Sequence, residues 1–542
     1  MATVAAGAST TVYLNPGDSI NIVGAANTDL TVTQTPAVTF KGGQPRISKL
    51  GPPAFNTTFG PVNVATAVTL ANASSSAAVA TFTVTTASGV NQVPVPSGFP
   101  YDMEGVTFTL QNYVPQTGMQ ATASKTPEQL FDGYSTARSA PGATFYVSTT
   151  GSDGNNGLTS GAAFLTMSKA VTSANTAAVP TKIYVAAGTY PRSSAPNFGT
   201  VYPAVDIAWI ASGNVIVGSF DQYTAPSADA TYTNTYSWAL ASVDRVVDLL
   251  NLDQYGRYQN LLNVSSAPIC NRTPNSWYTN GTTLYINRGD GAAVTNANTR
   301  VYRATVNVFM MNANVNQYFG DDGLTYSGFN FEGGQYGGFA TTSIVTGGSG
   351  RKIIVVKNSS FCYAGGVLST AGRGVALDSF NGAAWFFNCA ADRNVTDGFN
   401  AHNTYSATNC VMVTVNCSAH GNGESPAQSN NGWTSHENVT GVDIAGYYRG
   451  NHGGTCRSIN SSTSLFAGTL VTDDLGDVAF GGSITPTAFR TDNTAVYYCY
   501  QTAVNMEAGT IAYNATSGAT INLRQAWPTR AISTGAGTIG SW

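Results

Sequence analysis

Histidines and acids that could act as proton donors and acceptors gather in one short part of this 542-residue chain. The four histidines of the chain are His402, His420, His436 and His452, and the acids considered with them are Asp397 and Glu424. Such side chains are the usual general acids and bases of enzymes. Two carboxyls about 5–5.5 Å apart serve retaining glycosidases, and about 6.5–9.5 Å apart serve inverting ones. A cluster along the chain becomes a site only if the fold brings it together.

Metal binding is the other chemistry that histidines and acids suggest. Three histidines with Asp or Glu can hold zinc, but the histidine spacings of 18, 16 and 16 residues match no short metal motif. The segment "GSDGNNG" lacks the twelfth-position Glu of a calcium loop and predicts an ordinary turn. No GxSxG sequence is present. We therefore predict no metal and no cofactor.

The composition indicates an ordered, β-rich protein. Only 10% of residues are charged, 42% are hydrophobic, and 58 are Gly. Runs such as "AVATFTVTTASGVNQVPV" are rich in Thr, Val and Gly, which favours strands joined by tight turns over helices. The length allows about three or four ordinary domains, or fewer if one is a long repetitive body.

Charge and hydropathy exclude several partners. The net charge of −4 leaves no basic footprint, so we expect neither nucleic acid nor an anionic membrane as partner. No run approaches the roughly 18 apolar residues that span a bilayer. The N-terminus has no basic segment followed by an apolar stretch, so we expect no secretory signal and synthesis in the cytoplasm. The seven cysteines lack paired CxxC spacing and are predicted to be buried free thiols.

An internal repeat predicts the fold class. The segments "GFNFEGG", "VVKNSSFCYAGG", "WFFNCAADRN" and "VTVNCSAHGN" are apolar strands that carry Asn330, Asn358, Asn388 and Asn416, at separations of 28, 30 and 28 residues. Periods of 20 to 50 residues are typical of solenoids, in which each unit buries its apolar face by stacking on neighbours. There is no leucine-rich repeat pattern. The asparagines are expected to form a side-chain ladder at a recurrent turn.

A family resemblance agrees with this repeat. "FYVSTTGSDGNNGLTSGAAFLTMSKAV" resembles the opening segment of right-handed parallel β-helix proteins of the pectin-lyase-like class, apart from Ala163, where that family usually has Pro. The resemblance implies an all-β, right-handed parallel β-helix whose open end is closed by a short capping helix, with "IYVAAGTY" beginning the first coil. "NSWYTNGTTLYINRGDG" resembles a hairpin common in phage and carbohydrate-active β-helix proteins.

The chain is expected to divide into three parts. Residues 1–138 are predicted to form one or two N-terminal β attachment modules. Residues 139–515 are predicted to form the β-helix, with an inserted hairpin region at about 222–300. Residues 516–542 are predicted to be a C-terminal tail that closes a trimer.

Stacking predicts which side chains meet. Equal offsets from each repeat asparagine lie above one another, about 4.8 Å apart per coil. Asp397 is nine residues after Asn388, Glu424 is eight after Asn416, and His452 is eight after a projected position 444. We predict Asp397 and Glu424 as the catalytic acid/base pair, with His452 assisting them.

Further side chains are predicted to bind substrate beside this pair. His420 lies at offset four, where we expect it to assist catalysis, and Arg393 and Tyr363 lie at offset five. Arg393 would orient an anionic sugar, while Tyr363 and Trp433 would stack on sugar rings. His402 and His436 lie at offsets fourteen and twenty and would reach the groove from the side. The other interpretation is that the cluster only caps turns of the solenoid.

The combination resembles bacteriophage tailspikes and related receptor-binding proteins in architecture, although no tailspike motif matches residue for residue. The resemblance implies a homotrimeric virion tail appendage that contacts other tail proteins through its N-terminal module. It further implies binding and depolymerisation of a host surface polysaccharide, by glycoside hydrolysis or by a lyase reaction. The alternative is a non-catalytic receptor-binding or structural virion fibre.

Overall fold

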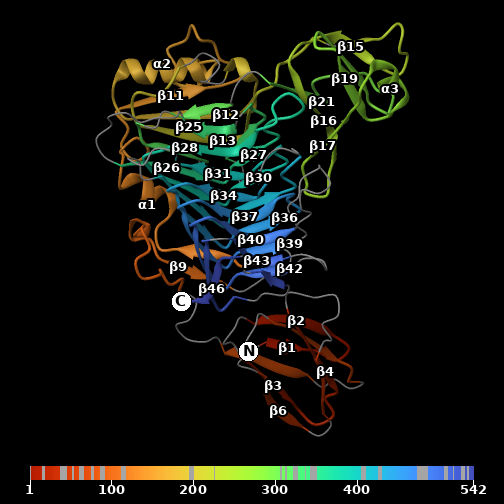
Figure 1. The fold of residues 1–542 in the computed structure, drawn as a ribbon, viewed down its shortest axis with the longest axis vertical. Helices are drawn as coiled ribbons and strands as arrows, with labels where there is room; N and C mark the ends of the chain where they lie inside the picture. The colour runs from red at the N-terminus through yellow and green to blue at the C-terminus, as the bar shows by residue number, and fades with distance from the viewer. Residues whose placement is uncertain are drawn as a thin grey trace.

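The computed structural model shows a β-sandwich, a long parallel β-solenoid and a module inserted into the solenoid (Figure 1). The structure describes residues 2–14, 19–36, 46–51, 54–59, 66–74, 79–85, 92–111, 118–194, 201–224, 226–304, 308–311, 314–321, 328–335, 337–341, 351–403, 410–424, 430–472, 486–505, 511–516, 518–526, 531–533 and 536–542. Among these, no helix has the length and apolar character that crossing a membrane requires.

The solenoid confirms the predicted parallel β-helix class. In the described residues between 317 and 515, each coil contributes a strand to each of three faces, and the strands of a face pair in parallel with those of the neighbouring coils. In the described residues the first and second faces join into one sheet of 19 strands, and the third face is a separate sheet of 9. Figure 1 shows the coils stacked one below another.

The strands of the first face are β11 (Ala143–Val147), β12 (Thr181–Tyr190), β13 (Ile207–Gly218), β23 (Gln317–Asp321), β26 (Lys352–Lys357), β29 (Gly382–Phe387), β32 (Cys410–Val415), β35 (Thr440–Ile444), β38 (Thr463–Ala467), β41 (Val496–Tyr500), β44 (Thr520–Arg524) and β46 (Thr538–Ser541). Those of the second face are β24 (Phe329–Glu332), β27 (Ser360–Cys362), β30 (Ala390–Asp392), β33 (Ser418–His420), β36 (Tyr447–Arg449), β39 (Leu470–Thr472) and β42 (Ala503–Asn505). Those of the third face are β22 (Phe309–Met311), β25 (Gly337–Thr341), β28 (Arg373–Asp378), β31 (Phe399–His402), β34 (Trp433–His436), β37 (Gly454–Ile459), β40 (Thr487–Asp492), β43 (Ile511–Ala515) and β45 (Ala531–Ser533).

Stacked apolar side chains fill the interior of the solenoid. Phe331 and Phe361 lie parallel in successive coils, with ring centroids 5.5 Å apart, and Phe339 packs on both from the third face. Burial of one such side chain contributes about 1.5–3 kcal/mol. The seven cysteines are also buried, as predicted, and no disulfide joins them.

The corner between the first and second faces explains the repeat asparagines. Asn358, Asn388 and Asn416 lie there with left-handed φ angles of 51°, 52° and 52°. Asparagine adopts this conformation at a lower cost than most residues that carry a Cβ. Ala445 takes the same place in the next coil, one residue from the projected 444.

The predicted asparagine ladder is confirmed only in part. Asn388 Nδ2 donates to Oδ1 of Asn358 at 3.3 Å. Asn416 instead bonds through both side-chain atoms to the backbone of Ala121. Our alignment of Asn330 with this corner was wrong. Asn330 lies within β24 and pairs in register with Ser360, which is two residues beyond Asn358.

A second asparagine stack, which sequence reasoning missed, is buried after the next corner. Asn394, Asn422 and Asn451 are fully buried in successive coils. Asn394 Nδ2 donates to Asn422 Oδ1 at 3.0 Å, and Asn422 Nδ2 donates to Asn451 Oδ1 at 2.9 Å. The same oxygens accept the backbone N–H groups of Asn394 and Asn422. The stack therefore satisfies polar groups that a corner would otherwise leave buried and unpaired.

A helix closes one end of the solenoid, as the resemblance implied. Helix α2 (Met167–Ala177) packs Met167, Ala170 and Val171 into the interior core beyond β11. Asp153 in the preceding loop accepts hydrogen bonds from the backbone and the hydroxyl of Thr166, the N-cap residue. The "GSDGNNG" turn thus positions the capping helix.

The N-terminal sandwich is smaller than the predicted module. Its two four-stranded antiparallel sheets enclose their own core in the described residues and lie beyond the end opposite α2 (Figure 1). They consist of β1 (Ala2–Val4), β8 (Ala80–Thr85), β3 (Ser19–Gly24) and β6 (Phe55–Phe59), and of β2 (Ser9–Leu14), β7 (Thr66–Asn72), β4 (Leu30–Pro36) and β5 (Arg46–Leu50).

The described residues 92–111 and 118–138, which we assigned to the N-terminal module, instead cover the outside of the first face. The elements of this cover are a short turn of helix η1 (Met103–Gly105), β9 (Phe108–Leu110), β10 (Ala121–Ala123) and α1 (Pro127–Asp132). Tyr101 and Phe108 pack on Trp385, whose Nε1 donates to the Tyr101 hydroxyl at 3.1 Å. The first face is therefore buried on both sides, which explains its continuous apolar runs. At the other end, β44 to β46 continue the faces of the solenoid within the predicted tail 516–542.

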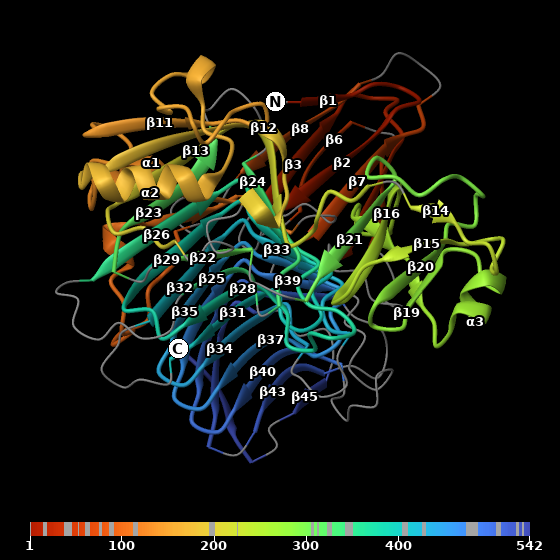
Figure 2. The same cartoon turned by 90° about the horizontal axis from the view of Figure 1, so that it is seen from above.

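The predicted inserted region is a compact module rather than a lone hairpin. In Figure 2 it projects from the side of the solenoid. Its strands form a five-stranded and a three-stranded sheet in the described residues, and include the predicted hairpin. Its elements are β14 (Ser227–Ala228), β15 (Tyr236–Ala239), β16 (Val243–Leu252), β17 (Tyr258–Asn260), β18 (Leu262–Asn263), α3 (Ala267–Arg272), β19 (Ser276–Thr279), β20 (Thr283–Asn287) and β21 (Thr299–Arg303).

Two short 3-10 turns lie outside the module. One, η2 (Ser160–Ala162), precedes α2, and the other, η3 (Arg192–Ser194), follows β12.

The buried asparagine stack makes a stability prediction. Asn422→Ala removes four side-chain hydrogen bonds and leaves their partners buried, so it should lower the free energy of unfolding by about 3–4 kcal/mol. Asn388→Gly is the control, because glycine keeps the left-handed corner and should cost about 1 kcal/mol or less. Thermal unfolding of the full chain compares them. Equal melting temperatures for the two variants would contradict this role of the stack.

Candidate functional site

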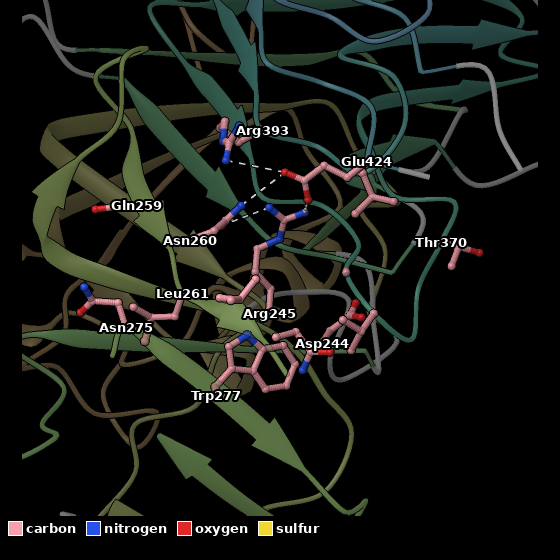
Figure 3. A pocket seen from close by; sticks show the side chains of 15 residues that line it. Asp244, Arg245, Gln259, Asn260, Leu261, Asn275, Trp277, Thr370, Arg393 and Glu424 are labelled. Atoms are coloured by element: carbon pink, nitrogen blue, oxygen red, sulfur yellow. Dashed lines mark hydrogen bonds and ion pairs between the residues drawn. The ribbon is translucent and has the colours of Figure 1, made fainter. Parts of the chain in front are cut away.

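A cavity of about 630 Å³ lies between the inserted module and the solenoid (Figure 3). We call it the interface pocket. Its polar side chains come from two remote parts of the chain: Thr370, Arg393 and Glu424 from the solenoid, and Asp244, Arg245, Gln259, Asn260, Asn263 and Asn275 from the module. In Figure 3, Trp277 lies on the side of Arg245 that is opposite Glu424. Amides and two guanidiniums therefore converge on one concave surface.

Glu424 lies at the centre of this surface. Its Oε2 is 3.5 Å from Nη2 of Arg245, and its Oε1 is 3.6 Å from Nη2 of Arg393. Asn260 Nδ2 donates to Oε1 at 3.4 Å. These distances exceed the roughly 2.7–2.9 Å of strong charge-assisted hydrogen bonds. The Glu424 side chain is 31% exposed, so it is a solvent-accessible carboxylate held loosely by two cations.

The two arginines are held more firmly than Glu424. Arg245, on β16, is 5% exposed in its side chain and donates from Nε to the Gly365 carbonyl at 3.1 Å. Its Nη1 donates to Asn260 Oδ1 at 3.2 Å. Arg393 follows β30, and its Nε lies 3.1 Å from Oδ2 of Asp253. Arg245 is thus fixed in place before any ligand arrives, and Arg393 is positioned by its ion pair with Asp253.

Asp244 is the other carboxylate of the interface pocket, and it organises backbone. Its Oδ1 accepts the N–H groups of Leu368 and Ser369 at 2.8 and 3.0 Å, and the side chain is buried. These bonds hold the loop after β27 against the module. Glu424 is therefore the carboxylate of the pocket that can meet a ligand, and it has no second exposed carboxylate beside it among the described lining residues.

A turn of the module anchors it to the second face below the pocket. Buried Asp392 accepts a hydrogen bond from Nε of Arg257 at 2.7 Å, and Nδ1 of His420 lies 3.2 Å from its other oxygen. The Tyr255 ring is parallel to the His420 ring, with centroids 6.0 Å apart. His420 is therefore part of the docking contact and does not line the interface pocket.

The predicted pair of Asp397 and Glu424 is not formed. Asp397 is 1% exposed, its Oδ1 accepts the Asn431 backbone N–H at 2.7 Å, and its Oδ2 accepts Asn400 Nδ2 at 2.6 Å. Asp397 therefore fixes a turn inside the solenoid, and our prediction that it acts as a catalytic acid or base was wrong. His452 lies outside the interface pocket, where its backbone N–H bonds to the Asn422 carbonyl.

Two aromatic residues predicted to stack on sugars are buried instead. Trp433 lies in the interior core and donates from Nε1 to Thr414 Oγ1 at 3.2 Å. Tyr363 is 2% exposed and lies parallel to Tyr302 of the module, with ring centroids 5.5 Å apart. Neither ring offers a face to a ligand, so both assignments were wrong. Arg393 lines the interface pocket, and its role in orienting an anionic sugar stays a prediction.

His402 and His436 lie on the third face, away from the interface pocket. They end β31 and β34 in neighbouring coils, and their rings stack with centroids 4.0 Å apart. Among the described residues, one group of side chains converges closely enough to hold a metal ion, and it consists of His402, His436 and Glu437. The histidine cluster thus divides into separate places in the fold.

Sequence reasoning missed the module side of the interface pocket. Arg245 and Asn260 precede Glu424 by 179 and 164 residues, and no periodicity relates an inserted module to the coils that it covers. The predicted insertion at about 222–300 was the one available signal, because insertions in repeat proteins often form a binding face.

Comparisons with known proteins add little. No protein-family model matches the sequence, and no curated protein matches it. The solved structure described as "The complex structure of XylC with xylose" is similar to this chain, with a TM-score of 0.38 and 13% sequence identity over 70% of each chain. Similarity at that level carries no argument about this chain, so function has to be argued from its own residues.

The docking contact makes a pH prediction. Burial raises the pKa of Asp392, but the charges of Arg257 and His420 outweigh burial and lower it from 3.8 to about 2. Because the folded pKa lies below the unfolded one, the carboxylate contributes stability that is complete above about pH 4 and is lost as the pH falls through about 2. The shift corresponds to about 2 kcal/mol.

Melting temperatures of the wild type and Asp392→Asn between pH 7 and pH 2 measure this contribution. At neutral pH the variant should melt lower, because Arg257 loses its counter-charge. The difference should shrink as the pH falls from 4 to 2. A difference that stays constant over that range would contradict the proposed ion pair.

Proposed function

We propose that this chain binds an acidic polysaccharide of a host cell surface and that the interface pocket holds one of its charged sugars. The observation that carries this proposal is the convergence of Arg245 and Arg393 on Glu424 inside one cavity. Guanidinium groups match the planar geometry of carboxylates and the oxygens of phosphates or sulfates. The surrounding amides can bond to sugar hydroxyls.

Glu424 makes an anionic ligand the better match. Its long contacts to both arginines are weaker than those that a ligand carboxylate could form in a bidentate arrangement. A ligand anion would therefore displace Glu424 from the guanidiniums, and the 31% exposed side chain can turn toward solvent. Neutral sugars lack the charge needed for this exchange.

The architecture supports a role in host attachment. A rigid solenoid presents the interface pocket on its flank, and the N-terminal sandwich has a separate core that can serve another partner. We propose a tailspike-like virion tail appendage that attaches to other tail proteins through this sandwich and assembles as a homotrimer. The resemblance of the chain to tailspikes in architecture supports this part of the proposal.

Cleavage of the bound polysaccharide is the second candidate. It is favoured by Glu424, the one solvent-accessible carboxylate among the described lining residues, beside two arginines that could neutralise a uronate. A Glu acting as base next to a neutralised uronate suits a lyase reaction. Hydrolysis by two carboxyls is less well supported, because Asp397 is buried and Asp244 is bonded to backbone.

Binding is tested with Arg393→Gln and Glu424→Gln on a panel of acidic and neutral surface polysaccharides. Arg393→Gln should weaken binding of an acidic polysaccharide about 10-fold or more, because a charge-assisted contact is lost. Glutamine already occupies left-handed positions in this chain, at Gln501 and Gln525, so position 393 should accept it. Glu424→Gln should keep or increase the affinity, because it removes the competing anion.

The control is Arg272→Gln, which changes an exposed guanidinium of the module outside the interface pocket. Calorimetric titration measures the affinities. Equal losses for Arg272→Gln and Arg393→Gln, or a marked loss for Glu424→Gln, would contradict binding of an anion in this pocket.

Cleavage is tested by following reducing ends and the absorbance of unsaturated uronates together. If the pocket cleaves, Glu424→Gln should lower the rate by about 100-fold while binding remains. A variant that cleaves at the wild-type rate would remove Glu424 from the chemistry. A wild type that binds but releases neither product would leave the binding function alone.

A further inference from the structure

The third face carries a pair of stacked histidines. The β31 and β34 strands run in parallel register, with Ala401 opposite Ser435, so the next residues, His402 and His436, lie one above the other. Their rings are 4.0 Å apart between centroids and 14° from parallel. Their 34-residue separation is the length of one coil, which explains why no short motif marked them.

An acid completes the group at the adjoining corner. Glu437 follows His436 with a left-handed φ of 54°. Its Oε2 is 3.4 Å from Nδ1 of His402, and its Oε1 is 3.9 Å from Nδ1 of His436. Asn460 Nδ2 donates to the same Oε1 at 3.2 Å and orients the carboxylate. Each of the three side chains is between 15% and 26% exposed, so the group can be reached from solvent.

One ring nitrogen of each histidine in this group accepts and donates no hydrogen bond among the described residues. Nε2 of His402 and Nε2 of His436 are buried, and neither has a hydrogen-bond partner among the described residues. The charges of Arg373 and Arg457 act on the His436 imidazole. A neutral imidazole is the form that binds metals. Arg457 is itself paired with Asp492 at 2.7 Å, so its charge is partly compensated.

We propose that His402, His436 and Glu437 form a binding site for a divalent transition metal ion of the zinc class. One ligand atom from each residue lies within 4.8 Å of the others. Around zinc, bonds of about 2.0–2.2 Å place such atoms roughly 3.3 Å apart, so small side-chain rotations suffice. Two imidazoles and one carboxylate also suit Fe²⁺, Co²⁺ or Ni²⁺ better than the oxygen-seeking Ca²⁺ and Mg²⁺.

The ion would join two neighbouring coils. His402 belongs to one coil, and His436 with Glu437 belongs to the next, so binding ties adjacent strands at their ends. Because the unfolded chain does not bring these residues together, the ion should stabilise the folded chain. The site is separate from the interface pocket and does not depend on what that pocket binds.

The full chain, freed of metal with a chelator, is titrated with Zn²⁺ in a calorimeter and with Co²⁺ by visible absorption. The expected result is about one ion per chain, a cobalt ligand-field band that excess Zn²⁺ removes, and a higher melting temperature with Zn²⁺. His402→Gln, His436→Gln and Glu437→Gln should each weaken binding about 10-fold or more. His452→Gln, a histidine outside the group, should bind like the wild type.

Glu437→Gln also separates metal binding from folding. It keeps the side-chain shape and an oxygen for Asn460, so it should fold even if a histidine variant does not. Absence of Zn²⁺ binding by the folded wild type at micromolar concentrations would overturn the proposal. Binding that Glu437→Gln and His436→Gln leave unchanged, or that His452→Gln abolishes, would overturn it as well.

Discussion

The parallel register between neighbouring coils is the constraint on which the rest of the structure depends. A coil cannot bury its inner face or pair its strand edges alone, so each strand takes its hydrogen bonds from the coils on both sides. Corners interrupt this pairing, and there the buried stack of Asn394, Asn422 and Asn451 supplies the missing partners. Register also fixes which side chains lie above one another. The stacked pair of His402 and His436 is a direct product of it.

The interface pocket arises where this regularity is broken. The inserted module leaves the solenoid after β13 and folds back on the second face, where the Asp392 ion pair and the Tyr255 ring anchor it. Its strands then place Arg245 opposite Glu424 of a distant coil. The repeated coils of the solenoid provide one side of the pocket, with side chains that point outward from successive strands. The inserted module provides the polar side chains on the opposite side. The chemistry of the pocket therefore depends on the docking contact as much as on the lining residues.

The sequence predicted the repetitive part well and the inserted part poorly. The repeat of asparagines and the opening segment were sufficient for the solenoid and its capping helix, because a single period governs every coil. Offsets from those asparagines also placed Arg393 and Glu424 near one another. The offsets gave a wrong prediction for Asp397, which is buried. Equal offsets show which residues lie above one another in successive coils, but they do not show whether a side chain at a corner points into the solenoid or toward solvent. No period connects Arg245 with the coils, so only the fold could reveal that side of the pocket.

The interface pocket is proposed to receive a charged sugar between Arg245 and Arg393. A crystal structure of the full chain with a short acidic oligosaccharide from a bound surface polysaccharide tests this most directly. The account predicts the acidic group of one sugar in contact with both guanidiniums, and Glu424 displaced from them. An oligosaccharide bound elsewhere on the solenoid, with the Glu424 contacts to both arginines intact, would contradict it.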